Sequence, residues 1–107
     1  MALGVTLALL YLRGQRTPFL GLVHGVVGAA GFCLLVLVLQ GPRRGDAMGV
    51  GSFGIAAAVL FGIALAFGLI IAVSIRHAPR VAGVTIATHA TLAIIAFVLL
   101  LAWASIG

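Results

Sequence analysis

Long apolar stretches separated by short polar segments are the dominant pattern of this chain. The stretches cover residues 1–14, 19–39, 49–75 and 81–106, and the last three contain no charged side chain. A helix needs roughly 20 apolar residues to cross about 30 Å of hydrocarbon, and each of these three supplies them. The first has 12 residues before Arg13 and reaches only about 18 Å, so either its arginines snorkel or its helix starts upstream of Met1. We therefore predict an all-α protein with four membrane helices, the first of them short.

The segments between the stretches are short and rich in Arg, Pro and Gly. Short connections make consecutive helices antiparallel neighbours, which predicts an integral membrane up-down four-helix bundle, a single transmembrane domain over residues 1–107. The arginines then divide between two sides of the membrane, with Arg13, Arg16, Arg76 and Arg80 on one side and Arg43 and Arg44 on the other. Because positive charge is enriched in cytoplasmic loops, the four-arginine side is expected in the cytoplasm of a cell inner membrane, with both termini outside.

Composition excludes several classes of protein. Hydrophobic residues make up 64% of the chain and charged residues 7%, too few charges to cover the surface of a soluble enzyme. The net charge of +5 comes from arginines placed between apolar runs, which form no basic face for nucleic acid. Cys33 is the only cysteine, so there is no disulfide framework and no motif for covalent haem. Asp46, the only acid, is expected to pair with Arg43 or Arg44, and Trp103 is expected at the opposite membrane interface.

An internal repeat is the most informative motif. Residues 24–35 align without gaps to residues 89–100, with the shared pattern His-small-x-x-small-x-x-small-Phe-x-Leu-Leu. Each copy opens a helix after a loop containing Arg and Pro, so helices 1–2 and helices 3–4 are predicted to be parallel pseudo-repeats. His24 and His89 would lie roughly 12 and 13 Å below the same membrane surface. Ionisable residues at that depth usually face the bundle interior and are functional candidates.

Small residues share the helical stripe of each histidine. They are Gly21, Gly28 and Gly31 beside His24, and Thr85, Ala93 and Ala96 beside His89. Small side chains would leave room for a planar macrocycle, although membrane helices also use them simply to approach each other.

Two imidazoles at equal depth predict one non-covalent haem b with His24 and His89 as its axial ligands. The second ring N–H of each ligand would be fixed by a backbone carbonyl one turn earlier or by Thr85. Arg13, Arg16, Arg76 and Arg80 are on the side nearer to both histidines and are candidates to hold the haem propionates. His77, at the same interface, is either a solvated residue or a partner of a propionate or a quinone headgroup.

With these features the chain resembles the four-helix membrane cytochromes b, typified by cytochrome b561 and the di-haem subunits of respiratory oxidoreductases. The resemblance covers about half the chain, through the pattern around His24 and His89. It implies electron transfer between a partner subunit or soluble donor and quinone, in a subunit without its own catalytic site. Two haems need four histidines and this sequence has three, so a complete transmembrane relay is not implied.

Three alternatives belong to other classes. A cofactor-free accessory or assembly subunit of a larger membrane complex would suit the many small residues. Chlorophyll binding would let each histidine ligate its own magnesium. Small multidrug transporters have a similar number of spans, but they use a carboxylate in the first span, and all four stretches here lack Asp and Glu.

Overall fold

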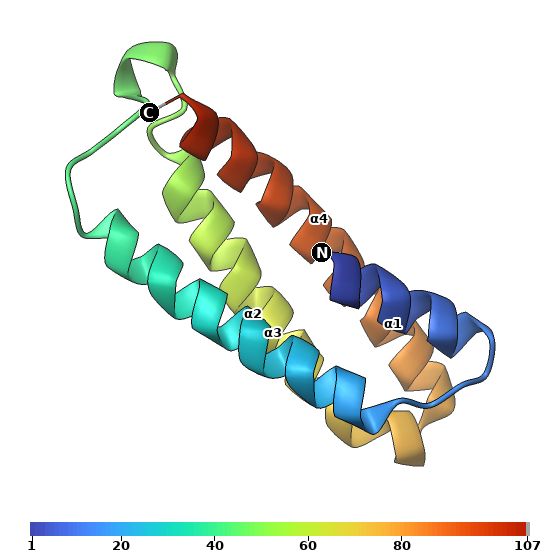
Figure 1. The fold of residues 1–107 in the computed structure, drawn as a ribbon. Helices are drawn as coiled ribbons and strands as arrows, with labels where there is room; N and C mark the ends of the chain where they lie inside the picture. The colour runs from blue at the N-terminus through green and yellow to red at the C-terminus, as the bar shows by residue number, and fades with distance from the viewer. Residues whose placement is uncertain (107) are drawn as a thin grey trace.

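The computed structural model describes residues 1–106, and these residues form four α-helices and one short 3₁₀ turn (Figure 1). The elements are α1 (Ala2–Leu12), α2 (Pro18–Leu39), η1 (Asp46–Met48), α3 (Phe53–His77) and α4 (Pro79–Ser105). The prediction of an all-helical chain is confirmed. Three helices, α2, α3 and α4, are long and apolar enough to cross a membrane, whereas α1 has 11 residues. The chain thus has the composition and helix lengths of a membrane protein.

The helices lie roughly lengthwise in a body of 47 × 20 × 19 Å. Figure 1 shows α3 and α4 side by side along the long axis, with α2 next to α3. The short α1 lies at the end of the molecule that holds the α3–α4 turn, and the N-terminus reaches only to about the middle of the long axis (Figure 1). Beyond that point α2, α3 and α4 continue without α1 beside them (Figure 1).

The most extensive helix contact joins α3 to α4, and small side chains form it. Ala57 and Ala64 of α3 are 0% and 3% exposed, seven residues apart. On α4 the buried positions Ala82, Ala96 and Trp103 follow the same seven-residue repeat. A repeat of seven keeps one stripe of a helix against its neighbour in left-handed packing. By contrast, large aliphatic side chains such as Leu34, Leu69 and Val84 are exposed, as expected where lipid is the solvent.

Prolines and glycines set where the helices begin. Pro18 and Pro79 occupy the first turns of α2 and α4, where a missing N–H leaves no hydrogen bond unmade. The apolar stretch predicted from residue 49 becomes helical only at Phe53. Gly45 and Gly49 flank η1 with φ of 82° and 73°, a left-handed conformation that glycine adopts readily and that turns the chain back before α3 can start.

Side chains of the loop between α2 and α3 form hydrogen bonds within the loop and to the end of α4. Arg43 Nε donates to the Asp46 carboxylate at 2.9 Å, so the expected ion pair is confirmed, and this bond lowers the pKa of Asp46 below its usual value. Arg44 donates through Nη2 to the carbonyl of Ala104 at 3.1 Å and lies 5.2 Å above the Trp103 ring. Trp103 lies at the expected end of α4, yet it is only 5% exposed because it packs beneath Arg44 and against α3.

Candidate functional site

The two histidines of the repeated motif meet between α2 and α4. The ring centroids of His24 and His89 are 6.0 Å apart, and the ring planes cross at 82°. Both side chains are half-buried, and no hydrogen bond joins the two rings. Residues 65 positions apart in the sequence are thereby brought together inside the apolar part of the molecule.

His89 is fixed by a carbonyl group of the neighbouring helix. Its Nδ1 lies 2.7 Å from the backbone oxygen of Ala64 in α3, so Nδ1 carries the proton in this bond and Nε2 retains its lone pair. The partner is a backbone carbonyl, as expected, but it comes from α3 and not from the preceding turn of α4. Position 89 lies seven residues from both Ala82 and Ala96, on the stripe of α4 that packs against α3.

Gly68, the residue one turn after Ala64 on α3, borders the imidazole of His89. A Cβ placed at Gly68 would lie 3.6 Å from Cε1 and 3.9 Å from Nδ1 of His89. A methyl group there makes ordinary contact, whereas a longer side chain would occupy the space that the imidazole fills beside the Ala64 carbonyl.

His24 is held by packing alone within the described chain, where its ring makes no hydrogen bond. A Cβ on Gly4 of α1 would stand 3.3 Å from Cε1 of His24, closer than nearly all real contacts of this kind. Each histidine is thus bordered by a glycine on the preceding helix, and these glycines lie 20 and 21 residues earlier in the sequence. The two imidazoles therefore share a glycine border, but only His89 also makes a hydrogen bond.

The small residues beside His24 lie on a largely open face of α2. Gly21 and Gly31 would meet no atom within 4 Å if they carried a Cβ, and Gly28 would meet only Leu65 of α3, at 3.7 Å. All three glycines are exposed. They leave space beside the histidine without helping to pack the helices together.

The small residues beside His89 have a different role. Thr85 is buried, and its hydroxyl donates to the carbonyl of Val81 in its own helix at 2.7 Å, so it does not fix an imidazole. Ala96 is fully buried in the contact with α3, and Ala93 is half-buried. Part of the stripe that sequence analysis assigned to a macrocycle therefore serves close packing of α3 and α4.

The charged candidates gather at one end of the molecule, at the α1–α2 loop and the α3–α4 turn. They are Arg13, Arg16, Arg76, Arg80 and His77, and all five side chains are exposed. Within residues 1–106 these five side chains make no hydrogen bond or ion pair with another residue. They supply positive charge at this end without forming part of the histidine pair.

The donor set restricts what the histidine pair could hold. Within residues 1–106 no group of three or more His, Cys, Asp or Glu side chains comes together. Zinc sites use three or four protein ligands, so two imidazoles by themselves suit a bare zinc ion poorly. A metal that brings its other ligands in a macrocycle needs only axial donors from the protein, and two imidazoles supply them.

Sequence analysis missed Gly4, Ala64 and Gly68, although each borders one of the imidazoles. Their relation to the histidines depends on how the helices are rotated about their axes, and a helix that is apolar all round carries little information about rotation. One signal was available: the seven-residue spacing of Ala82, His89 and Ala96 indicates which stripe of α4 faces a neighbouring helix.

A comparison of the chain with protein-family models gave no match, and comparisons with curated proteins and with solved structures gave none either.

Proposed function

We propose that this protein is a membrane electron-transfer subunit that carries one non-covalent haem b between His24 and His89. The observation that carries the proposal is the 6.0 Å separation of the two ring centroids. Metal–imidazole bonds are about 2.0 Å long and the ring centre lies about 1.1 Å beyond the nitrogen, so two rings on opposite sides of one metal have centroids about 6 Å apart. The separation in this chain matches that value.

The angle between the rings is also compatible with axial ligation. Two imidazoles that would hold one metal from opposite sides can be rotated relative to each other, so the 82° crossing of the ring planes is compatible with this role.

The hydrogen bond of His89 favours the same role. Histidines that bind metals commonly donate their other N–H to a carbonyl or carboxylate, which fixes the ring and raises the basicity of the ligating nitrogen. His89 makes this bond to Ala64 and keeps Nε2 available. The glycines at positions 4 and 68 keep side chains away from the edges of both rings. These residues would hold the haem, which supplies the one-electron chemistry when bound.

The finer features of the proposal concern topology and surroundings. The four helices form an up-down bundle in which helices 1–2 and helices 3–4 are parallel pseudo-repeats, and the similar glycine borders of His24 and His89 support this relation. The protein lies in a cell inner membrane with the four-arginine end in the cytoplasm and the termini outside. It exchanges electrons with another subunit of a membrane complex or a soluble donor, and quinone is the acceptor.

A second candidate function is a cofactor-free accessory subunit of a larger complex. One observation favours it: the α3–α4 contact closes tightly on alanines, with Thr85 and Ala96 buried inside it. In that case the histidine pair is a packing element, and the exposed glycines of α2 are a surface for another subunit.

Three single variants separate these functions. The protein is expressed under haem-replete conditions, purified in mild detergent and reduced with dithionite, and its absorption spectrum is compared with that of the oxidised form. Under the haem proposal His24→Ala and His89→Ala each lose the low-spin spectrum, while His77→Ala keeps it because that side chain lies exposed at the end of α3. Equal spectra for all three variants would refute the ligand assignment, and no haem in the unaltered protein would favour the accessory subunit.

A further inference from the structure

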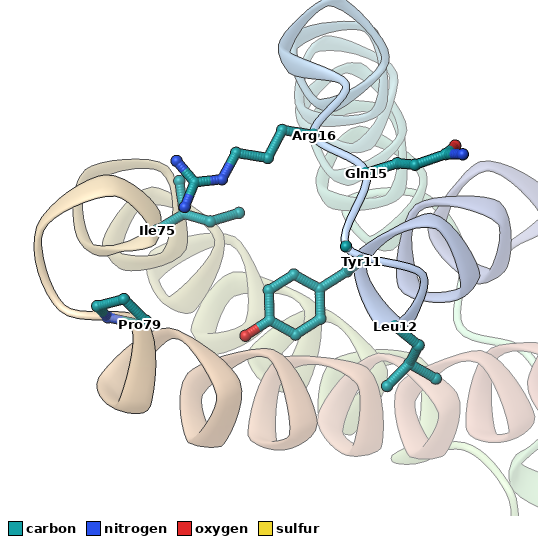
Figure 2. Close-up of a pocket in the computed structure, with 7 residues that line it drawn as sticks. Tyr11, Leu12, Gln15, Arg16, Ile75 and Pro79 are labelled. Atoms are coloured by element: carbon teal, nitrogen blue, oxygen red, sulfur yellow. The ribbon is translucent and has the colours of Figure 1, made fainter.

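A hollow of about 370 Å³ opens at the four-arginine end of the molecule, away from the histidine pair. It lies between the end of α1, the α1–α2 loop and the α3–α4 turn (Figure 2). Its lining consists of Tyr11, Leu12, Gly14, Gln15, Arg16, Ile75 and Pro79. Three separate segments of the chain therefore contribute to one concave surface at the ends of the helices.

Two hydrogen-bond donors face this opening. Figure 2 shows the guanidinium of Arg16 extending over Ile75 and the hydroxyl of Tyr11 pointing towards the α3–α4 turn. The Tyr11 hydroxyl lies against α4 where Gly83 has no side chain; a Cβ there would be 3.6 Å away. In the part of the chain that the structure describes, neither group is hydrogen-bonded to another residue. The donors are available to a bound molecule.

The positive charge at this end of the molecule favours an anionic ligand. Four arginines belong to the loop and the turn that border the hollow, and the only acid of the chain, Asp46, is at the opposite end, paired with Arg43. A guanidinium presents a planar fork of N–H groups that matches the oxygens of phosphate or carboxylate in a bidentate manner. The Tyr11 hydroxyl adds one further donor to the same anion.

The apolar lining of the hollow favours an anionic ligand that also has an apolar part. Leu12, Ile75 and Pro79 are apolar lining residues of the hollow, and a small hydrated ion would leave them in contact with water. Polar headgroups and the first carbons of the acyl chains meet at the depth where membrane helices end. Basic pockets between helices at that depth are suited to the headgroups of anionic lipids.

We propose that this hollow binds the phosphodiester of an anionic phospholipid, with Arg16 and Tyr11 as donors to the phosphate oxygens and with Leu12, Ile75 and Pro79 against the glycerol and upper acyl carbons. The bound lipid joins the end of α1 to the α3–α4 turn. The proposal does not depend on haem binding.

Native mass spectrometry tests lipid binding to this hollow. The detergent-purified protein is titrated with phosphatidylglycerol or with phosphatidylcholine. The phosphatidylglycerol adduct is expected to weaken about 10-fold in Arg16→Gln, because a charge-assisted pair is lost, and by a smaller factor in Tyr11→Phe. Arg13→Gln is the matched control: it removes the same charge from the same loop, but Arg13 does not line the hollow. Its affinity is expected to change less than 2-fold, and phosphatidylcholine is expected to bind more weakly throughout.

The other results overturn the proposal. Equal weakening by Arg16→Gln and Arg13→Gln would show general attraction by a basic end and no built site. Competition by millimolar inorganic phosphate as effective as that by the lipid would assign the hollow to a free anion. Phosphatidylglycerol binding confined to haem-free chains would assign it to haem propionates. Circular dichroism of the variants confirms that they remain folded, so a loss of binding reports on the hollow.

Discussion

Substituting Gly68 tests how His89 is held, because the effect is expected to depend sharply on side-chain length. In Gly68→Ala the added methyl group lies 3.6 Å from Cε1 of His89, an ordinary contact, so the imidazole keeps its hydrogen bond to Ala64. In Gly68→Leu the next carbon extends about 1.5 Å farther, and part of the side chain then takes the space of the imidazole. The ring must rotate away from the Ala64 carbonyl.

The size of the effect follows from two contributions. A side-chain hydrogen bond inside a membrane protein is worth about 0.6 kcal/mol on average and at most about 1.7 kcal/mol. Overpacking of a close helix contact costs about 1–3 kcal/mol. Gly68→Leu should therefore lower the free energy of unfolding by about 2–5 kcal/mol, whereas Gly68→Ala should change it by less than about 1 kcal/mol.

Two measurements on the same variants check this prediction. Unfolding in mixed micelles gives the stability difference, and nitrogen NMR of ¹⁵N-labelled histidine reports whether Nδ1 of His89 still carries the hydrogen-bonded proton. We expect Gly68→Ala to retain the unaltered signal and Gly68→Leu to lose it. If both variants keep the signal and the stability of the parent protein, His89 is not held against α3 at Ala64 in the way described.

Two further predictions concern the opposite end of the molecule. Gly54→Ala should destabilise the protein by about 1–3 kcal/mol in the same unfolding assay, because the added Cβ would lie 2.7 Å from the Trp103 ring. The control variant Gly31→Ala should not destabilise the protein, because its Cβ would meet no atom within 4 Å. The Arg43–Asp46 bond holds the pKa of Asp46 below its usual value of 3.8. The stabilising effect of this ion pair is therefore present above pH 3.8 and is lost as the pH falls through the lowered pKa. Carboxyl ¹³C NMR should show that the pKa of Asp46 rises in Arg43→Gln, and an unchanged pKa would contradict this cause.

The course of the chain could be predicted closely from the sequence. Charges cannot lie in hydrocarbon and proline is readily accommodated in the first turn of a helix, so the breaks at residues 13–18 and 76–80 had to fall near the observed ends of α1 and α3. Helix α3 begins at Phe53, later than the apolar stretch predicted from residue 49. The reason is that the left-handed glycines at positions 45 and 49 shape a turn that hydropathy alone does not indicate.

The histidine pair could be predicted for a different reason. Two rare polar residues in register within a repeat, at equal distance from basic loops, are placed at one depth by geometry alone. The bond from His89 to Ala64 and the contact of Gly4 with His24 could not be predicted, because they require the rotation of each helix about its axis. When every face is apolar, packing of small residues sets that rotation, and many arrangements have similar sequence patterns.

The haem content of the purified, unaltered protein, measured as the pyridine haemochrome per chain, tests the central claim most directly. Two imidazoles whose centroids lie 6.0 Å apart should hold one haem b per polypeptide, and we expect a ratio of one. A ratio of zero, from protein that is folded and was produced with abundant haem, would contradict the electron-transfer proposal.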